Sequence, residues 1–314
     1  MEQIKYWGEK PYHSLDYEMK HRFGEKVYKI SLDGGLTCPN RDGTLDSRGC
    51  LFCSGRGSGD FAAPLSSSVT AQISQGIQGI SKRKQVGRKF IAYFQSFTNT
   101  YGPLSYLEKI YKEALAHPDV VMLSVATRPD CLPPEVLDLL SECNKIKPVM
   151  VELGLQTSKE STARLIRRGY PLSVYDNAVS SLQSLGLEVV THVIAGLPGE
   201  SEKDFLATLD HVTACHSDGI KIHLLHILKG TDLADLYLSG EYPVLTKEAY
   251  IHLVLKAIAK LPPEMVIHRL TGDGPKDLLL APLWSSHKRE VLNEIHKQLK
   301  LQDIWQGKEY LKHE

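Results

Sequence analysis

Three cysteines in one polar loop are the residues of this chain best suited to chemistry. Cys38, Cys50 and Cys53 lie in residues 38–53, CPNRDGTLDSRGCLFC, with the spacing C-x11-C-x2-C. A Cys-x2-Cys pair places two thiolates on one turn, close enough to share a metal ion or cluster, and Cys38 can fold back as a third ligand. The loop is therefore a candidate metal site with three protein ligands.

The number of ligands separates the possible metals. A structural zinc site needs four, but no Cys or His lies between Cys53 and His117, and the nearest upstream candidates are His13 and His21. Disulfide-bonded or free cysteines are a further alternative, which a chain without a signal peptide disfavours. A [4Fe–4S] cluster held by three cysteines leaves one iron open to S-adenosylmethionine (SAM), whose reductive cleavage starts radical chemistry. This open position favours the cluster.

The composition is that of a globular protein with no general attraction for nucleic acid. The chain has 314 residues, 42% hydrophobic and 24% charged, enough for one large α/β domain and a modest extension. Lys and Arg number 37, as do Asp and Glu, so any RNA contact must use a local patch. The amino terminus has no apolar leader, and no run approaches the ~18 apolar residues of a membrane span. We therefore expect a cytoplasmic protein.

Short apolar runs alternate with amphipathic stretches along most of the chain. Strands are expected at 27–32, 90–94, 120–126, 148–156, 187–196, 219–228 and 264–269. Helices are expected at 69–81, 103–117, 133–143, 158–185, 201–215 and 246–261. This alternation implies a parallel sheet, so we predict an α/β fold, a partial or near-complete TIM-like (β/α)6–7 barrel, with a doubly wound open sheet as the alternative.

The pattern divides the chain into three parts. Residues 1–26 are aromatic and basic and either cap the barrel or touch RNA, capping being favoured. Residues 27–262 form the barrel, and 263–314 a helical carboxyl-terminal extension packed on its exterior. In such barrels the reactive groups lie on the loops after the strands, and the polar residues there fall at 38–53, 95–99, 127–130, 156–157, 196–200 and 229–231.

These motifs resemble the radical SAM superfamily. Phe52 matches its aromatic-Cys ending, whereas the long first spacing differs from the common C-x3-C-x2-C form and is similar to the loop of the Elongator catalytic subunit. ATRPDCL at 126–132 is similar to that subunit's ETRPD motif, with Ala126 replacing the glutamate, and residues 151–170 are similar to the strand and helix that follow. From 26 to 233 the chain resembles the bacterial YtqA/MnmL family, relatives of the Elongator subunit.

The resemblance implies where SAM binds. Gln156 and Arg168 match in type and spacing the glutamine and arginine that hold SAM in oxygen-independent coproporphyrinogen oxidases, and a guanidinium can pair with the methionyl carboxylate. Residues 192–200, HVIAGLPGE, match the strand that approaches the adenine, and 95–101, QSFTNTY, replace the Gly-Gly-Glu motif that receives the methionyl amine. The candidate cofactor-binding residues are therefore Gln95, Ser96, Asn99, Thr127, Gln156, Arg168, His192 and Gly196.

Several other polar residues have both a functional and an ordinary interpretation. His192, His223 and His226 alternate on strands, where a satisfied core histidine is commoner than a ligand. Lys229 follows the sixth strand and is the candidate catalytic residue, with a plain loop lysine as the alternative. Cys131, Cys143 and Cys215 are expected to be buried as small hydrophobic residues. The densest basic cluster, a candidate nucleic-acid site or a solvated helix face, comprises Lys82, Arg83, Lys84, Arg88 and Lys89.

For function, the resemblance implies maturation of the wobble uridine of tRNA, in which a 5-carboxymethylaminomethyl group of uridine or 2-thiouridine becomes 5-aminomethyl. The implied cofactors are a [4Fe–4S] cluster and SAM. The implied partners are the anticodon region of tRNA and a reductant such as flavodoxin or ferredoxin, and a methyltransferase acting on 5-aminomethyluridine would follow. Two alternatives stay open: a radical SAM enzyme acting on a porphyrinogen or a protein side chain, and a non-catalytic zinc- or RNA-binding barrel.

Overall fold

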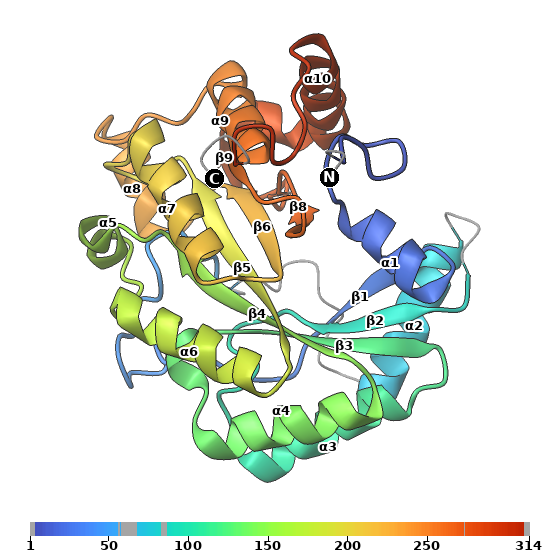
Figure 1. Ribbon diagram of the computed structural model, residues 1–314. Helices are drawn as coiled ribbons and strands as arrows, with labels where there is room; N and C mark the ends of the chain where they lie inside the picture. The colour runs from blue at the N-terminus through green and yellow to red at the C-terminus, as the bar shows by residue number, and fades with distance from the viewer. Residues whose placement is uncertain (1–3, 56, 58–67, 83–86, 273, 311–314) are drawn as a thin grey trace.

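The strands form one curled sheet. The computed structural model describes residues 4–55, 57, 68–82, 87–272 and 274–310, and in it seven strands lie in the order β1-β2-β3-β4-β5-β6-β8 (Figure 1). Their bounds are β1 Tyr28–Leu32, β2 Phe90–Phe94, β3 Val120–Thr127, β4 Val149–Gln156, β5 Glu188–Ala195, β6 Gly219–Leu224 and β8 Val266–Arg269.

The order and direction of the strands identify the architecture. Every neighbouring pair is parallel, and within the described residues no pairing of β8 with β1 closes the ring. A doubly wound sheet reverses its strand order at a switch point, whereas this sheet follows the chain from one edge to the other. The prediction of a partial TIM-like barrel is confirmed, and the doubly wound alternative is excluded.

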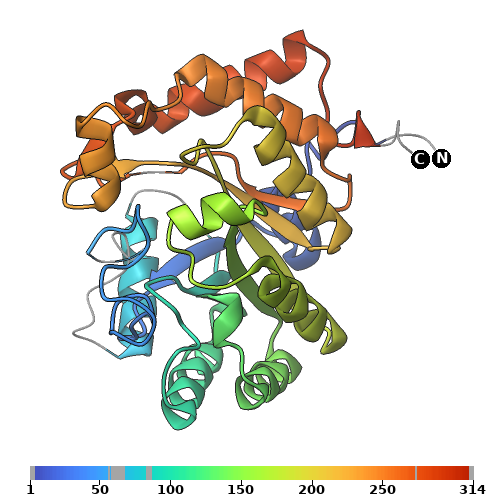
Figure 2. The same ribbon diagram turned by 90° about the vertical axis from the view of Figure 1, so that its left-hand side faces the viewer.

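Helices follow the strands, and the longer ones cover the convex face of the sheet (Figures 1 and 2). They are α2 Val69–Ser81, α3 Leu104–Ala116, α4 Pro134–Ile146, α5 Glu160–Leu165, α6 Leu172–Ser184, α7 Glu202–Ala214, α8 Asp232–Leu238 and α9 Lys247–Lys260. Each long helix is amphipathic; α3, for example, buries Leu107, Ile110, Tyr111, Ala114 and Leu115. Because the helices pack on the outside, the concave face is left for a site.

The amino-terminal segment closes one end of the half barrel. Helix α1, Leu15–Phe23, begins at Ser14, whose side chain accepts the N–H of Tyr17. Its Met19 packs against apolar side chains from the amino-terminal halves of the strands, namely Ile91, Met122, Met150 and Val190. The described part of segment 1–26 therefore occupies the capping position that the sequence favoured.

The chain departs from the expected strand pattern after β6. Residues 219–228 were expected to form one strand, but β6 ends at Leu224, and β7, Ile227–Leu228, pairs antiparallel with β9, Leu279–Ala281. The adjacent Leu224 and Leu225 are both buried but belong to different hydrophobic clusters, so the alternation of inward and outward side chains breaks between them.

The carboxyl-terminal part contributes both to the sheet and to its exterior. The seventh strand, β8, comes from beyond residue 262, where the sequence placed the start of the extension. A short 3-10 helix, Leu283–His287, and α10, Lys288–Leu301, follow, and α10 packs against α9. In the described ranges every helix is too short or too polar to cross a bilayer.

Candidate active site

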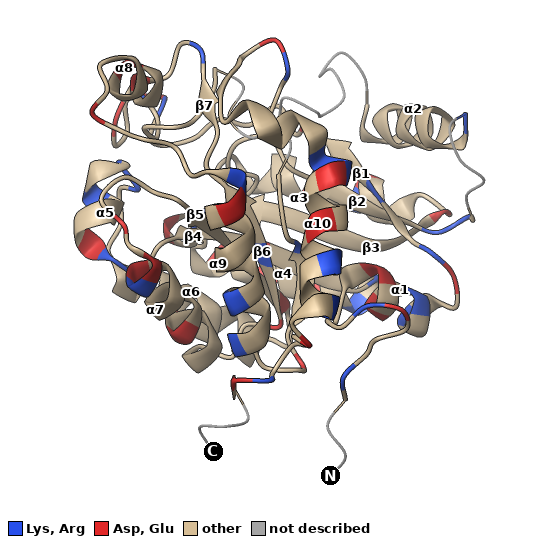
Figure 3. Ribbon diagram, turned by 90° about the horizontal axis from the view of Figure 1, so that it is seen from above, with Lys and Arg blue, Asp and Glu red and all other residues tan. Residues whose placement is uncertain are grey.

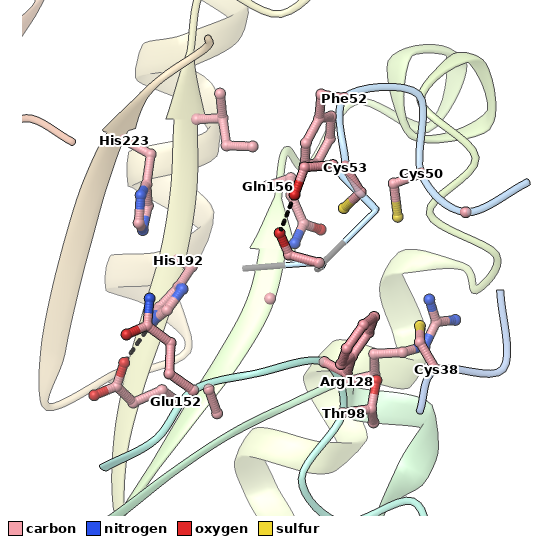
Figure 4. A pocket seen from close by; sticks show the side chains of 18 of the residues that line it. Cys38, Cys50, Phe52, Cys53, Thr98, Arg128, Glu152, Gln156, His192 and His223 are labelled. Carbon is pink, nitrogen blue, oxygen red and sulfur yellow. Dashed lines mark hydrogen bonds and ion pairs between the residues drawn. The ribbon is translucent and has the colours of Figure 1, made fainter. Parts of the chain in front are cut away.

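A cavity of about 310 Å³ lies inside the curl of the sheet, at the carboxyl ends of the strands. All three loop cysteines line it, and Figure 4 shows Cys38, Cys50 and Cys53 on the side opposite His192. The loop leaves β1 and turns back on itself: the N–H of Arg41 donates to the carbonyl of Cys38 at 2.8 Å, and that of Cys53 to the carbonyl of Cys50 at 3.1 Å. These turns bring the three thiols to one wall.

Two side chains of the loop hold the cysteines in place. The amide of Asn40 donates to the carbonyl of Arg167 at 2.7 Å and to Sγ of Cys50 at 3.5 Å. The guanidinium of Arg41 donates to the carbonyl of Cys53 at 2.9 Å. These bonds tie the loop to itself and to the turn after α5, so the cysteine wall is organised by the protein itself.

The surroundings of Cys50 favour the thiolate, which is the form that binds metals. A hydrogen bond from Cys53 and the nearby charge of Arg128 lower the pKa of Cys50 to about 6 in spite of its burial. The same hydrogen bond, together with burial, raises the pKa of Cys53. Burial raises the pKa of Cys143 to about 11 and that of Cys131 to about 12, as expected of buried thiols.

The spacing of the loop thiols favours a cluster over zinc. Within the described ranges, the one trio of metal-binding side chains with all ligand atoms within 4.8 Å of one another is Asp176, His211 and Cys215. Cys50 and Cys53 are hydrogen-bonded, so at least one of these two thiols lies farther than 4.8 Å from that of Cys38. A tetrahedral zinc ion, bound at about 2.3 Å, would draw thiolates to roughly 3.8 Å of one another. In a [4Fe–4S] cluster each cysteine binds a different iron. Cys215, expected to be buried, is only half-buried.

Gln156 has a strained backbone at the end of β4. Its φ is +65°, in a region that residues other than glycine rarely adopt, and the pairing of β4 with β5 shifts register between Gly154 and Gln156. Its side chain lines the cavity between the cysteine loop and His192 (Figure 4). Its Oε1 is buried without a hydrogen-bond partner in the described part of the chain. Strain combined with an unpaired buried acceptor indicates a ligand site.

Arg168 lines the same cavity, but its guanidinium is largely occupied by the protein. Four of its five N–H groups donate, to the carbonyls of Tyr170 at 2.9 Å, Leu155 at 3.3 Å and Thr157 at 2.6 Å, and to Oε1 of Glu160 at 3.3 Å. Arg168 thus holds the turn that carries Gln156. The prediction that it binds the methionyl carboxylate depends on its one remaining N–H.

The other predicted cofactor residues are divided between the cavity wall and the core. Gln95 and Thr127 line the cavity, whereas Ser96 and Asn99 are buried outside its lining. The amide of Asn99 donates to the carbonyls of Phe94 at 3.1 Å and Ala126 at 2.9 Å, and so joins the ends of β2 and β3. Ser96 and Asn99 therefore lie outside the lining, although their neighbours Phe97 and Thr98 belong to it, and their roles toward SAM stay predictions.

Gly196 and Lys229 also lie off the cavity wall. Gly196 has a φ of +85°, and a Cβ there would lie 2.8 Å from Leu245, so close packing explains the glycine. Lys229 is exposed, and its Nζ donates to the carbonyl of Asp277 at 3.1 Å. Lys229 thus does not line the cavity, although Leu225, His226 and Leu228 before it do, and its catalytic role stays a prediction.

The basic cluster lies at the other end of the sheet. Lys82 follows α2, and Arg88 and Lys89 precede β2, at the amino ends of the strands, whereas the cysteines lie at the carboxyl ends. The side chain of Arg88 is 92% exposed, and Lys89 donates to a backbone carbonyl at the end of α1 at 2.7 Å. Arg83 and Lys84 lie outside the described residues. On α7 and α10, Lys and Arg are mixed with Asp and Glu (Figure 3).

Sequence reasoning missed a charged layer inside the half barrel. Glu152 of β4 is fully buried, and each carboxylate oxygen accepts two hydrogen bonds. Oε1 accepts from Lys29 at 2.5 Å and from Ser124 at 2.6 Å, and Oε2 accepts from His192 at 2.7 Å and from Lys221. The sequence did carry a signal for this layer. Lys29, Glu152 and Lys221 are charged residues within otherwise apolar strands, where side chains can face the interior of the barrel.

The charges of this layer perturb one another. Burial, partly opposed by Glu152, lowers the pKa of Lys221 to about 7. Burial and the charge of Lys221 lower the pKa of His192 to about 4. Although burial opposes ionisation of Glu152, Lys221 and Lys29 hold the pKa of its carboxyl well below the usual range. Glu152 is therefore the ionised centre of the layer.

Arg128 is a second residue that the sequence did not single out as a site. It lines the cavity and forms a bidentate ion pair with Asp130, in which two guanidinium nitrogens donate to the two carboxylate oxygens at 2.9 and 2.7 Å. Its guanidinium also lies 5.1 Å from the centroid of the Tyr170 ring. It sits in the ATRPDCL motif, directly after Thr127. Its fixed positive charge supports thiolate at the neighbouring cysteine wall.

Comparison with known proteins identifies the family to which this cavity belongs. Residues 47–212 match the model of the radical SAM superfamily, and residues 217–301 that of the radical SAM C-terminal domain. The chain belongs to the radical SAM superfamily. Membership implies a [4Fe–4S] cluster and SAM as cofactors, and the cavity of this radical SAM chain places three cysteines and Gln156 around one space.

Individual relatives share most of the length of this radical SAM chain. YtqA of Bacillus subtilis (strain 168) is 45% identical over 300 residues, covering 96% of this chain and 93% of YtqA. YhcC of Escherichia coli (strain K12) is 36% identical over 283 residues, covering 90% of each. The structure of the archaeal Elp3 of Methanocaldococcus infernus matches with a TM-score of 0.68 at 17% identity, over 89% of this chain and 64% of that one. The last comparison shows a shared fold.

Proposed function

We propose that this radical SAM enzyme modifies the wobble uridine of tRNA, converting 5-carboxymethylaminomethyl-(2-thio)uridine to 5-aminomethyl-(2-thio)uridine. The observation that carries the chemistry is that three cysteine thiols and the unpaired Oε1 of Gln156 share one cavity. Among the described lining residues there is no fourth cysteine, so a fourth coordination position remains for an exogenous ligand. The donor set therefore fits a three-cysteine [4Fe–4S] cluster and SAM.

The roles of the residues follow from their places in the cavity. Cys38, Cys50 and Cys53 would hold the cluster, and Gln156, supported by Arg168, would bind SAM beside it. When bound, the cluster and SAM supply the one-electron cleavage that yields a radical able to abstract hydrogen from the substrate. Apolar side chains of the wall exclude water from this space; they are Phe52, Ile194, Leu224, Leu225 and Leu228.

The tRNA substrate is supported by the family resemblance of the sequence and by the charge of the cavity. The group to be shortened ends in a carboxylate, and the inner wall carries the cations Lys221 and Arg269. A uridine would enter from the carboxyl ends of the strands, away from the basic cluster near β2. Arg48 lies on the cysteine loop at this end, with its side chain 64% exposed, and could meet a phosphate there, although it pairs with Asp46 at 3.2 Å.

Anaerobic reconstitution followed by an assay on tRNA tests the proposal. Purified protein with iron, sulfide, SAM and a reductant is incubated with tRNA bearing 5-carboxymethylaminomethyluridine, and nucleosides and 5′-deoxyadenosine are measured by mass spectrometry. We expect the 5-aminomethyl nucleoside and 5′-deoxyadenosine to appear together, with Cys38→Ala as the inactive control.

The same assay separates the competing functions. If 5′-deoxyadenosine forms while the uridines remain unchanged, the tRNA substrate is wrong, and porphyrinogens and protein side chains are tested next. If the protein binds one zinc ion, no iron–sulfur cluster forms and SAM stays intact, the radical chemistry itself is wrong.

A further inference from the structure

The inner part of the cavity carries more positive than negative charge. Tyr93, Glu152, His192, Lys221, His223 and Arg269 line it, and Figure 4 shows Glu152, His192 and His223 across the cavity from the cysteines. Lys29 joins this layer through its pair with Glu152. Even without Lys221, whose pKa burial lowers to about 7, the basic Lys29 and Arg269 outnumber the one acidic side chain, Glu152. A buried charge without a counter-ion is energetically unfavourable, so this excess of positive charge favours an anionic ligand in the cavity.

Glu152 cannot supply the missing negative charge. A carboxylate offers about four acceptor positions. All of them are used by Lys29, Ser124, His192 and Lys221. Glu152 therefore serves as a fixed counter-ion for the two lysines and is not free to act on a substrate.

Two donors of the layer remain available. The pairing of strands places His192, Lys221 and Arg269 side by side on β5, β6 and β8. In the part of the chain that the structure describes, the guanidinium of Arg269 makes no hydrogen bond or ion pair. Nε2 of His223, two residues along β6 from Lys221, is buried and also lacks a partner there. Both residues line the cavity, and Figure 4 shows His223 on the same side as His192, across from the cysteines.

We propose that Arg269, Lys221 and His223 form a carboxylate-binding subsite that holds the terminal carboxylate of the group being modified. The inference rests on the proposed function for the identity of the substrate, but the subsite itself is defined by the cavity. A guanidinium can bind both oxygens of a carboxylate. The ammonium of Lys221, which already donates to Glu152 and to the hydroxyl of Tyr93, has one N–H left to add to this. The cysteines lie across the cavity from this layer, so a carboxylate held here places the adjoining methylene toward SAM.

A small mimic tests the subsite without tRNA. N-methylglycine reproduces the secondary amine and carboxylate of the carboxymethylaminomethyl group, and N-methylglycinamide lacks the charge. We expect N-methylglycine, measured by anaerobic calorimetry, to bind the reconstituted enzyme with SAM, and Arg269→Gln to weaken binding about tenfold or more. Arg269→Lys should recover part of the affinity. The matched control is Arg289→Gln, which alters an exposed arginine on α10.

Several outcomes would overturn the subsite. They are absence of saturable N-methylglycine binding, equal binding of the amide, or an unchanged Kd in Arg269→Gln. A rise in the KM for SAM in Arg269→Gln, with N-methylglycine binding at wild-type strength, would show that the carboxylate held there is the methionyl one. If the wild type cleaves SAM and binds N-methylglycine but leaves the wobble uridine unchanged, only the proposed function fails.

Discussion

Nζ of Lys29 on β1 lies 2.5 Å from Oε1 of Glu152 on β4, although β2 and β3 separate these strands in the sheet. Such a contact requires the sheet to curl until its concave face brings distant strands within reach. Lys221 of β6 reaches the other oxygen of the same carboxylate. One buried glutamate thus connects three strands across the interior of the half barrel.

We expect Glu152→Gln to be strongly destabilising, because it leaves the buried Lys221 and the half-buried Lys29 without their counter-ion. The loss should be about 3–5 kcal/mol in the free energy of unfolding, measured by urea denaturation. Adding Lys221→Met to Glu152→Gln should recover part of it, since one unpaired charge is removed. Glu290→Gln, at an exposed position of α10, is the control. Equal stability of Glu152→Gln and the control would contradict this account.

The strain at Gln156 makes an unusual prediction about glycine. At most positions glycine is less stable than alanine, but at a φ of +65° glycine is unstrained and alanine is not. Gln156→Gly should therefore be about 1 kcal/mol more stable than Gln156→Ala in urea denaturation. Both variants should bind SAM more weakly than the wild type, because both lack Oε1. An alanine variant as stable as the glycine variant would show that the backbone is relaxed there.

Substitution of a loop cysteine should lower the iron content of the protein, whereas substitution of a core cysteine should not. We expect Cys38→Ala, Cys50→Ala and Cys53→Ala each to abolish SAM cleavage and to lower iron and sulfide per chain after reconstitution, since each removes a cluster ligand. Cys143→Ala, at a buried thiol packed in the main core, should keep wild-type iron content. Full iron in a variant of any loop cysteine would remove that residue from the proposed ligand set.

Acid should destabilise the cluster-free protein partly through His192. Its pKa is lowered from 6.5 to about 4, so between these values the unfolded chain binds a proton that the folded chain does not. The stabilisation is present above about pH 6.5 and is lost as the pH falls toward about 4. Between these pH values, one such proton changes the free energy of unfolding by about 1.4 kcal/mol per pH unit.

The measurement is the free energy of unfolding in urea across this pH range. His192→Gln should reduce the slope of the free energy of unfolding against pH by about 1.4 kcal/mol per pH unit, because glutamine does not titrate. His252→Gln, which removes a more exposed imidazole on α9, is the comparison variant. Parallel slopes for the wild type and His192→Gln would mean that His192 titrates alike in both states.

The cysteine wall and the strand–helix order could be predicted from the sequence because both are local. The thiols lie within 16 residues of one another, 38–53, and the apolar periodicity marks each strand and helix without knowledge of its neighbours. Gln156 was predicted from its place at a strand end and from the resemblance to oxygen-independent coproporphyrinogen oxidases, and it lines the cavity. The same reasoning did not show that Ser96, Asn99 and Lys229 lie outside the cavity lining, because local patterns do not place a side chain relative to a wall built by distant strands.

The sequence alone therefore determined the chemistry available to this protein, a three-cysteine loop above the ends of parallel strands. The tertiary structure decided which polar groups are used up and which remain for a ligand. Arg168 is consumed by four hydrogen bonds, Glu152 is saturated by four donors, and Arg269 is left without a partner among the described residues. Hydrogen bonds between distant strands depend on the curl of the sheet, and local sequence patterns do not encode that curl.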